Sequence, residues 1–404
     1  MRTFALWCAL ALGALPAFAQ QVRYDDVVRN LRNPDAKVRL SAVQLLHESK
    51  YPEAIVPIAA LVNDPVDEIQ LEAIGAELSF FLVEDVPSKK RVAFVVEKRT
   101  PGARAMNAFA LGPLGVWPRP LPAELAKSLI AAIDDESPRV RVEAIYALGT
   151  IGRAPVDAET AQGLIKALDH YDPVIRAAAA KVIGRLEVKQ AGDALLKAVN
   201  DSQAPVRYAA MRALGQIRDE RAVQALTEQL NFYGKGEGAW SALDALARIA
   251  HATSLPVFRQ RLADKDEYLR RAAAEGIARA NDVSQVGALE TSVGNDPSET
   301  VRAAMTFALQ KMGRNVVPRL VEFLGRDKVA AQVGEYFLEL GPPIAPALLP
   351  HLADPSPEIR ANVAMILGQI GGADTIAALQ PLTTDRDKDV IEAATRAIER
   401  IKMR

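Results

Sequence analysis

The chain has 404 residues, of which 50% are hydrophobic but only 5% aromatic, and its formal net charge is -1. Burial must therefore rest on alanine, leucine and valine, which suits packed helices better than strands, where aromatic and β-branched residues are enriched. The nearly balanced charge argues against a chain that binds nucleic acid or anionic lipid by overall attraction, so we expect no nucleic-acid partner.

The first 19 residues read as a secretory signal peptide. Arg2 gives a positive start, residues 4–15 form a short apolar run, and a small-x-small cleavage site ends at Ala19. The run is too short to span a bilayer, and no later segment has the apolar length of a span; a retained anchor is the alternative. We expect cleavage after Ala19 and export, with the bacterial periplasm as the compartment. Cys8 is removed with this segment, so disulfide and thiol chemistry are not expected.

From residue 20 to the C-terminus the chain repeats one motif, which is clearest over residues 134–152. Ser137 and Pro138 predict a helix start, because serine caps free amides and proline in the first turn sacrifices no hydrogen bond. Counting from Arg141 as position zero, apolar residues recur at +3, +6, +7 and +10, and Gly152 marks the helix end. A helix of this kind buries its apolar stripe by stacking on further copies of itself.

Twelve copies keep this phase, at steps between 28 and 37 residues. A second, shorter helix is predicted between successive copies, for example over residues 158–168 and 191–199, so each unit is a helical hairpin. We therefore predict an all-α fold: an α-solenoid, or superhelix, of about twelve hairpins over residues 20–404. Position zero is occupied by Arg39, Gln70, Arg104, Arg141, Arg176, Arg207, Ala239, Arg270, Arg302, Ala330, Arg360 and Ile391.

The repeated pattern D-x-x-P-x-V-R-x-x-A-x-x-A-L-G-x-I-G resembles HEAT repeats, and in particular the branch named after phycobilisome bilin lyases. The resemblance implies a protein-binding scaffold and only rarely an enzyme. HEAT-type iron hydroxylases use several His-Glu pairs, whereas this sequence has only His47-Glu48. The four histidines share no repeat, and no nucleophile motif is recognisable. We expect no catalytic residue, no metal and no cofactor.

Arginine at position zero predicts a structural role. It lies in line with the apolar stripe, where a guanidinium needs an acceptor. Aspartates of the preceding turns, such as Asp172 and Asp201, supply acceptors, which predicts an aspartate–arginine ladder along the stack. The alternative is a set of unconnected surface charges. The predicted ladder arginines are Arg39, Arg104, Arg141, Arg176, Arg207, Arg270, Arg302 and Arg360.

Positions +5 and +9 point away from the apolar stripe and carry several cations, which makes them candidates for partner binding through an acidic segment or a polyanion. The alternative is that cations in the last helical turn complement the helix dipole. Asp244, Glu275 and Glu339 interrupt the same face. The candidate residues are Lys181, Arg185, Arg212, Arg248, Arg279 and Lys311.

Residues 79–122 are the least repetitive part of the chain. Residues 94–96 fit either helix or strand, and the prolines between residues 112 and 122 force an extended loop. Trp117 on that loop, with Arg119 beside it, is the best single candidate for a partner contact. The alternative is a structural plug that covers exposed helices.

These patterns favour an exported, non-catalytic scaffold that binds a protein or peptide along the concave face of the solenoid. The competing hypothesis is an accessory lyase-like factor, or another enzyme factor, that uses the irregular region 79–122.

Overall fold

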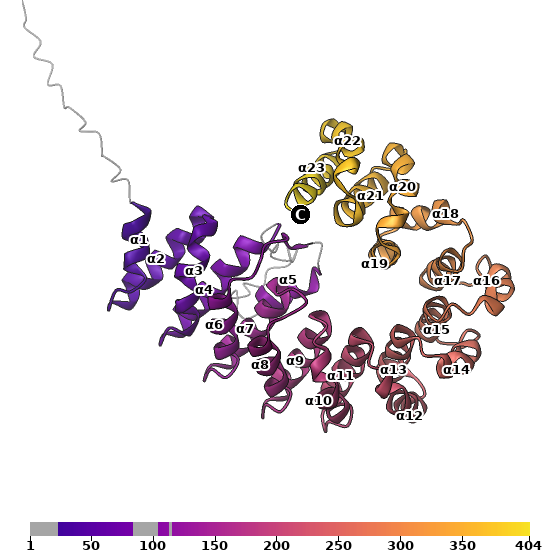
Figure 1. Ribbon diagram of the computed structural model, residues 1–404, viewed down its shortest axis with the longest axis horizontal. Coiled ribbons are helices and arrows are strands. Elements are labelled where there is room, and N and C mark those ends of the chain that lie inside the picture. The colour runs from indigo at the N-terminus through magenta and orange to yellow at the C-terminus, as the bar shows by residue number, and fades with distance from the viewer. Residues whose placement is uncertain (1–22, 84–103, 113–114) are drawn as a thin grey trace, which may run out of the picture.

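The computed structural model describes residues 23–83, 104–112 and 115–404, and these ranges contain 23 α-helices joined by short turns. The helices form an arc that curls back on itself, so that the C-terminal helix approaches the part of the arc where α5 lies (Figure 1). The prediction of an all-α solenoid is confirmed. The expected signal peptide and residues 94–96 lie outside the described residues.

Each of the twelve motif copies falls on a helix. In Figure 1 these motif helices follow the inner side of the arc. They are α2 (Ala36–Ser49), α4 (Asp67–Phe81), α5 (Arg104–Ala110), α7 (Pro138–Ile151), α9 (Pro173–Arg185), α11 (Ala204–Ile217), α13 (Gly236–Ile249), α15 (Glu267–Arg279), α17 (Glu299–Lys311), α19 (Asp327–Leu340), α21 (Pro357–Ile370) and α23 (Lys388–Lys402).

Shorter helices alternate with the motif helices and lie on the outer side of the arc (Figure 1). Most begin with a 3-10 turn or end in one, which keeps them only a few residues long. They are α1 (Tyr24–Asn30), α3 (Ile55–Ala59), α6 (Ala123–Ala132), α8 (Ala158–Ala167), α10 (Gly192–Ala198), α12 (Val223–Tyr233), α14 (Leu255–Arg261), α16 (Val286–Ser292), α18 (Val317–Glu322), α20 (Ala345–Leu348) and α22 (Ile376–Leu379).

A glycine at position +8 lets two successive motif helices approach closely. A Cβ atom on Gly215 would lie 2.6 Å from the Cα atom of Ala245, which is at +6 of the next motif helix. The same pairing brings Gly368 against Ala397, where the corresponding distance is 2.8 Å. Both distances are too short for a side chain, so glycine at +8 sets how tightly two repeats stack.

The motif copy at Arg104 was predicted to be one of the stacked repeats, but its helix does not take a place in the stack. Helix α4 packs directly on α7, and α6 packs on α3, so these two hairpins are neighbours. Gln70 spans them, donating from Nε2 to Asp135 over 2.8 Å. Helix α5 instead packs on α7, where the Phe109 ring lies 5.3 Å from the ring of Tyr146. The stack therefore holds the other eleven motif helices, and α5 lies on its inner side (Figure 1).

The irregular region is only partly irregular. Residues 79–81 still belong to α4, and the extended stretch before α6 is held to the end of that helix. Val116 forms an antiparallel bridge with Leu82, and the Val83 amide donates to the Gly115 carbonyl over 3.0 Å. This bridge fixes where Trp117 lies.

Candidate interaction surface

The position-zero arginines are used inside the stack. Arg176 donates from Nε and Nη2 to the two carboxylate oxygens of Asp201, over 2.8 and 3.0 Å, and from Nη1 to the carbonyls of His170 and Tyr171, over 2.9 and 3.1 Å. The preceding turn therefore supplies carbonyls, whereas the carboxylate comes from the following repeat, which differs from the prediction. The same two-point pairing joins Arg39 to Asp64, Arg270 to Asp296 and Arg360 to Asp385.

Each of these aspartates stands at position -6 and has a second task. Asp201 Oδ1 also accepts from the Gln203 amide over 2.8 Å and so closes the turn before α11. The hydrogen bond from Arg176, together with that amide, lowers the pKa of Asp201. One carboxylate thus links the start of its own motif helix to the motif helix before it.

The other four predicted ladder arginines lack this pairing. For three of them, position -6 of the next motif helix holds another residue than aspartate: His170 after Arg141, Tyr233 after Arg207 and Leu324 after Arg302. Arg141 and Arg302 instead reach Asp172 and Glu299, each at 3.4 Å. Arg207 donates to the Tyr233 hydroxyl over 2.7 Å. Arg104, on the displaced helix α5, lies 3.2 Å from Nε2 of His47.

The two ends of the stack also end the ladder. The first motif helix has Asn33 at position -6, whose side-chain oxygen still accepts from the Asp35 amide over 2.9 Å. The last motif helix has Ile391 at position zero. Among the described residues, the ladder therefore runs between the first and the last motif helix, with a neutral amide at one end and an aliphatic side chain at the other.

Two cations predicted for partner binding contact aromatic residues of the protein itself, where Arg185 is partly buried but Lys181 stays exposed. The Arg185 guanidinium stacks 3.7 Å from the centre of the Phe109 ring and donates to the Phe109 carbonyl, and burial lowers its pKa. The Lys181 ammonium lies 3.5 Å from the Tyr146 hydroxyl. Helix α5 therefore occupies the inner side of the arc beside α7 and α9.

Further along the arc, the +9 cations form ion pairs with the acids that interrupt their face. Glu339 on α19 accepts from Arg279 over 2.9 Å and from Lys311 over 2.7 Å, which joins α15, α17 and α19. Although burial opposes the effect, the hydrogen bonds and charges of these two cations lower the pKa of Glu339. Arg248 pairs with Asp244 at 3.4 Å. The row of candidates is therefore a row of alternating charges rather than a basic stripe.

One buried acid anchors this network. Glu275, on α15, is 2% exposed and accepts from Arg271 over 3.0 Å and from the Tyr336 hydroxyl over 2.6 Å. Burial, with the nearby Glu275 charge, raises the pKa of Tyr336 well above its usual range, so this phenol stays a proton donor.

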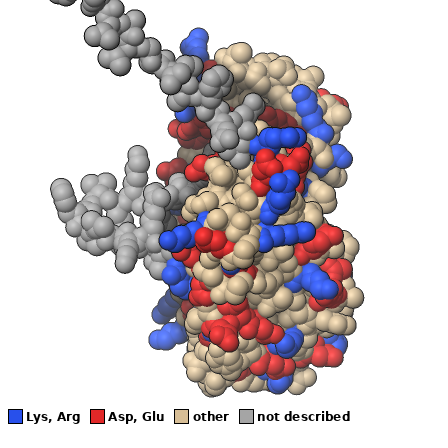
Figure 2. Space-filling view, turned by 90° about the vertical axis from the view of Figure 1, so that its left-hand side faces the viewer, with Lys and Arg blue, Asp and Glu red and all other residues tan. Residues whose placement is uncertain are grey.

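The inner face that remains open to solvent carries both signs of charge. Arg212 on α11 and Glu237 on α13 are paired at 3.1 Å, with side chains 43% and 54% exposed. The Lys311 side chain is 31% exposed. On the side of the molecule where α1–α4 lie, Figure 2 likewise shows basic and acidic side chains interspersed. A surface of this kind is suited to a partner that carries both charges.

Trp117 meets the last helix of its own chain. Its amide donates to the Phe81 carbonyl over 2.7 Å, and its carbonyl accepts from Arg153 Nη2 over 2.9 Å. The Arg400 guanidinium, on α23, lies 5.8 Å from the centre of a Trp117 ring. Burial, with the charges of Arg153 and Arg404, lowers the pKa of Arg400 to about 10. This contact holds the C-terminal helix against the loop and so closes the arc, which favours a structural role for the loop over a role in partner binding.

Arg119 follows on the same strand-like stretch. Its amide donates to the Trp117 carbonyl over 2.8 Å, which curls the chain tightly after the tryptophan. Its Nε atom is buried and has no hydrogen-bond partner among the residues that the structure describes. Arg119 is thus placed beside the closing contact between Trp117 and Arg400.

Sequence reasoning missed two buried carboxyl groups, Glu143 against α5 and Glu77 on α4. Glu143 accepts from the Ala105 amide over 2.9 Å, and burial raises its pKa to about 7. Glu77 is 0% exposed, neither of its oxygens has a partner among the described residues, and burial raises its pKa well above the usual range. A signal existed for Glu77, because it stands at position +7, where Leu148 is found in the clearest copy.

The geometry defines a superhelical repeat protein whose arginines serve stacking. The HEAT repeat profile matches residues 161–231, 236–310 and 317–399, which is more than half of the chain, and the protein belongs to the HEAT repeat family. No match was found among curated proteins. Within the described ranges, no helix is long and apolar enough to cross a membrane, and no group of three or more His, Cys, Asp or Glu side chains is arranged to hold a metal ion.

Solved structures that match this chain share few identical residues with it. An engineered protein is 18% identical, with a TM-score of 0.40 and coverage of 94% of this chain and 98% of the other. The complex of CpcE and CpcF of phycocyanin lyase from Nostoc sp. PCC7120 is 18% identical, with a TM-score of 0.34 and coverage of 75% and 93%. Human deoxyhypusine hydroxylase in complex with glycerol is 19% identical, with a TM-score of 0.29 and coverage of 69% and 96%.

Proposed function

We propose that this protein is an exported, non-catalytic scaffold that binds a protein or peptide partner along the inner, concave face between α11 and α17. The observation that carries the proposal is the exposed pair Arg212–Glu237 on α11 and α13, with the partly exposed Lys311 further along the same face on α17. HEAT repeats commonly mediate protein interactions, and a solenoid offers its concave side as an extended binding surface.

The division of labour among the side chains supports this surface. The ladder arginines and the glycines at +8 form contacts between repeats inside the stack, so they cannot distinguish one partner from another. The +5 and +9 side chains differ from repeat to repeat and lie on the inner side, where exposed charge gives specificity and speeds association more than it adds affinity. Export follows from the signal peptide expected over residues 1–19.

The proposal is tested by crosslinking the full chain to its neighbours in the periplasm of the native cell and identifying what is captured. Arg212→Glu and Lys311→Glu should each reduce recovery of one defined protein severalfold, because they reverse a charge on the inner face. Lys189→Glu is the matched control, since Lys189 lies on the turn that leads to the outer helix α10. A protein recovered equally by all three variants, or none recovered by the unsubstituted chain, would contradict the proposal.

A second candidate, an accessory enzyme factor that uses region 79–122, is favoured by one observation. Burial raises the pKa values of Glu77 on α4 and of Glu143, which contacts α5, and perturbed titratable groups often mark active sites. Metal or cofactor retained in stoichiometric amount by purified protein, and lost in Glu143→Gln, would support this candidate. Retention unaffected by Glu143→Gln would count against it.

A further inference from the structure

The first repeat of the stack leaves a docking position open. The residue at position +6 is buried in the ten stacked motif helices that follow α2. In four of them it packs against a glycine at position +8 of the preceding motif helix; these glycines are Gly149, Gly184, Gly215 and Gly368. Leu45 holds position +6 on α2, yet it is 48% exposed. Among the residues that the structure describes, no motif helix precedes α2, and α1, with seven residues, is too short to cover this whole face.

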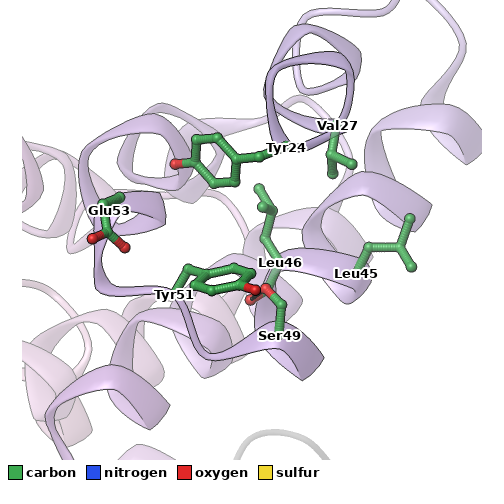
Figure 3. A pocket seen from close by; sticks show the side chains of 7 residues that line it. All are labelled: Tyr24, Val27, Leu45, Leu46, Ser49, Tyr51 and Glu53. Carbon is green, nitrogen blue, oxygen red and sulfur yellow. Dashed lines mark hydrogen bonds between the residues drawn. The ribbon is translucent and has the colours of Figure 1, made fainter. Parts of the chain in front are cut away.

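A pocket of about 520 Å³ lies where that missing neighbour would pack. Val27, Leu45 and Leu46 supply apolar walls, and the rings of Tyr24 and Tyr51 lie edge to face with centres 6.3 Å apart. Figure 3 shows the two tyrosines on opposite sides of the opening, with Leu46 between them and the Glu53 carboxylate at one end. An apolar cavity with aromatic walls and a single charged group is the usual form of an anchor site.

The opposite end of the stack is built differently. On α23, the outward positions are taken by Thr395, Glu399 and Lys402, all exposed and polar, as a capping repeat requires. Glu399 is at position +8 of this helix. If a second copy stacked its α23 on α2, this carboxylate would be buried against Leu45, at a cost that excludes head-to-tail association.

The acidic residues around the pocket favour a ligand that carries a positive charge. Glu53 lines the pocket, and Asp25 lies on the first turn of α1. Burial and the charges of both carboxylates raise the pKa of the Tyr24 hydroxyl, whose ring lines the pocket. Lys50 is close in sequence but does not line the pocket. A basic group is therefore favoured at the Glu53 end.

We propose that the N-terminal end of the solenoid docks an amphipathic helix of a partner protein, which extends the stack as a preceding motif helix would. This helix places a small residue against Leu45, an apolar side chain against the exposed side of the Tyr24–Tyr51 pair, and a lysine or arginine beside Glu53. Such docking reads as helix-in-groove recognition. The site is separate from the inner face between α11 and α17, so either one can fail without the other.

The test selects peptides from a displayed library of randomised 16-residue helices on the full chain, with Leu45→Glu as the counter-selection target. We expect the selected peptides to combine an apolar anchor, a small residue and a basic residue. Their affinity, measured by fluorescence anisotropy, should fall at least about tenfold with Tyr51→Ser, as for a buried anchor, and about threefold with Glu53→Gln, as for a rim charge. Arg212→Glu, on the inner face, should leave the affinity unchanged.

Several results would overturn the proposal. One is that no peptide is enriched over the Leu45→Glu target, or that enriched peptides carry acidic residues. Another is concentration-dependent dimerisation that Leu45→Glu abolishes, which would make a second copy the occupant. A third is a melting temperature lowered by several degrees in Leu45→Glu without any peptide, which would identify a segment of the same chain as the occupant. Unchanged circular dichroism of each variant establishes that it is folded.

Discussion

Arg176 of one repeat and Asp201 of the next form a two-point ion pair whose side chains are only 15% and 13% exposed. Arg176→Ala should lower the free energy of unfolding by about 1–3 kcal/mol, because it leaves Asp201 and two carbonyls without their donor. Urea denaturation followed by circular dichroism measures the loss. Arg218→Ala is the control, since Arg218 is exposed at the end of α11 and its replacement should cost almost nothing. If both variants lost the same free energy of unfolding, the ladder arginines would contribute no more than ordinary surface charges.

A double-mutant cycle isolates the pair from the turn that Asp201 closes. Asp201→Asn retains the side-chain oxygen that accepts from Gln203, as Asn33 does in the first repeat, but removes the charge. We expect Arg176→Ala to cost less in the Asp201→Asn background, with a coupling of about 0.5–2 kcal/mol. Strictly additive losses would show that the carbonyl contacts alone carry the effect.

The contact between Arg400 and Trp117 should hold the arc closed. A cation over an aromatic ring contributes about 0.5–2 kcal/mol, enough to bias a hinge-like opening but not to determine whether the chain folds. In the chain without residues 1–19, which contains no native cysteine, spin labels at Lys127→Cys and Lys402→Cys should give a broader and longer distance distribution with Trp117→Ala. Trp117→Phe retains a ring and should stay close to the parent. A distribution that does not change with Trp117→Ala would show that other contacts close the arc.

Glu143 should make stability depend on pH in the direction opposite to an ordinary salt bridge. Burial raises its pKa from 4.5 to about 7 despite the Ala105 amide, so the folded state binds the proton more tightly than the unfolded chain. Its contribution is fully present below about pH 4.5 and is lost as the pH rises through about 7. Relative to Glu143→Gln, the parent should lose on the order of 2 kcal/mol between pH 5 and pH 8.

Urea unfolding at four pH values between 5 and 8 measures this difference, and Glu159→Gln, at an exposed acid of α8, is the control. If the parent and Glu143→Gln keep parallel pH profiles, Glu143 is ionised with a partner that the folded chain supplies.

The positions of the repeats could be predicted from the sequence because every stacked helix must meet the same requirement. Its residues at +3, +6, +7 and +10 must be apolar. It did not show that Arg104 belongs to a displaced helix, because local periodicity says nothing about which helices become neighbours; the pairing of Gln70 with Asp135 decides that in space. For a similar reason, the sequence did not show which acid pairs with each cation of the +9 row. Glu339 lies 60 residues from Arg279, and only the curvature of the arc brings them together.

Glu339 should stabilise the C-terminal half of the arc by holding two cations of other repeats. Arg279 is 9% exposed and depends on Glu339 and Glu275 for neutralisation, so Glu339→Gln should cost about 1–3 kcal/mol at pH 7. Because the two cations lower the pKa of Glu339, its contribution is present above pH 4.5 and is lost as the pH falls through the folded-state pKa. The difference between parent and variant should therefore shrink in acid. Glu335→Gln, one turn earlier on α19 and exposed, is the control and should show neither effect. A loss that is the same at pH 7 and in acid would mean that Glu339 acts through its packing rather than through its charge.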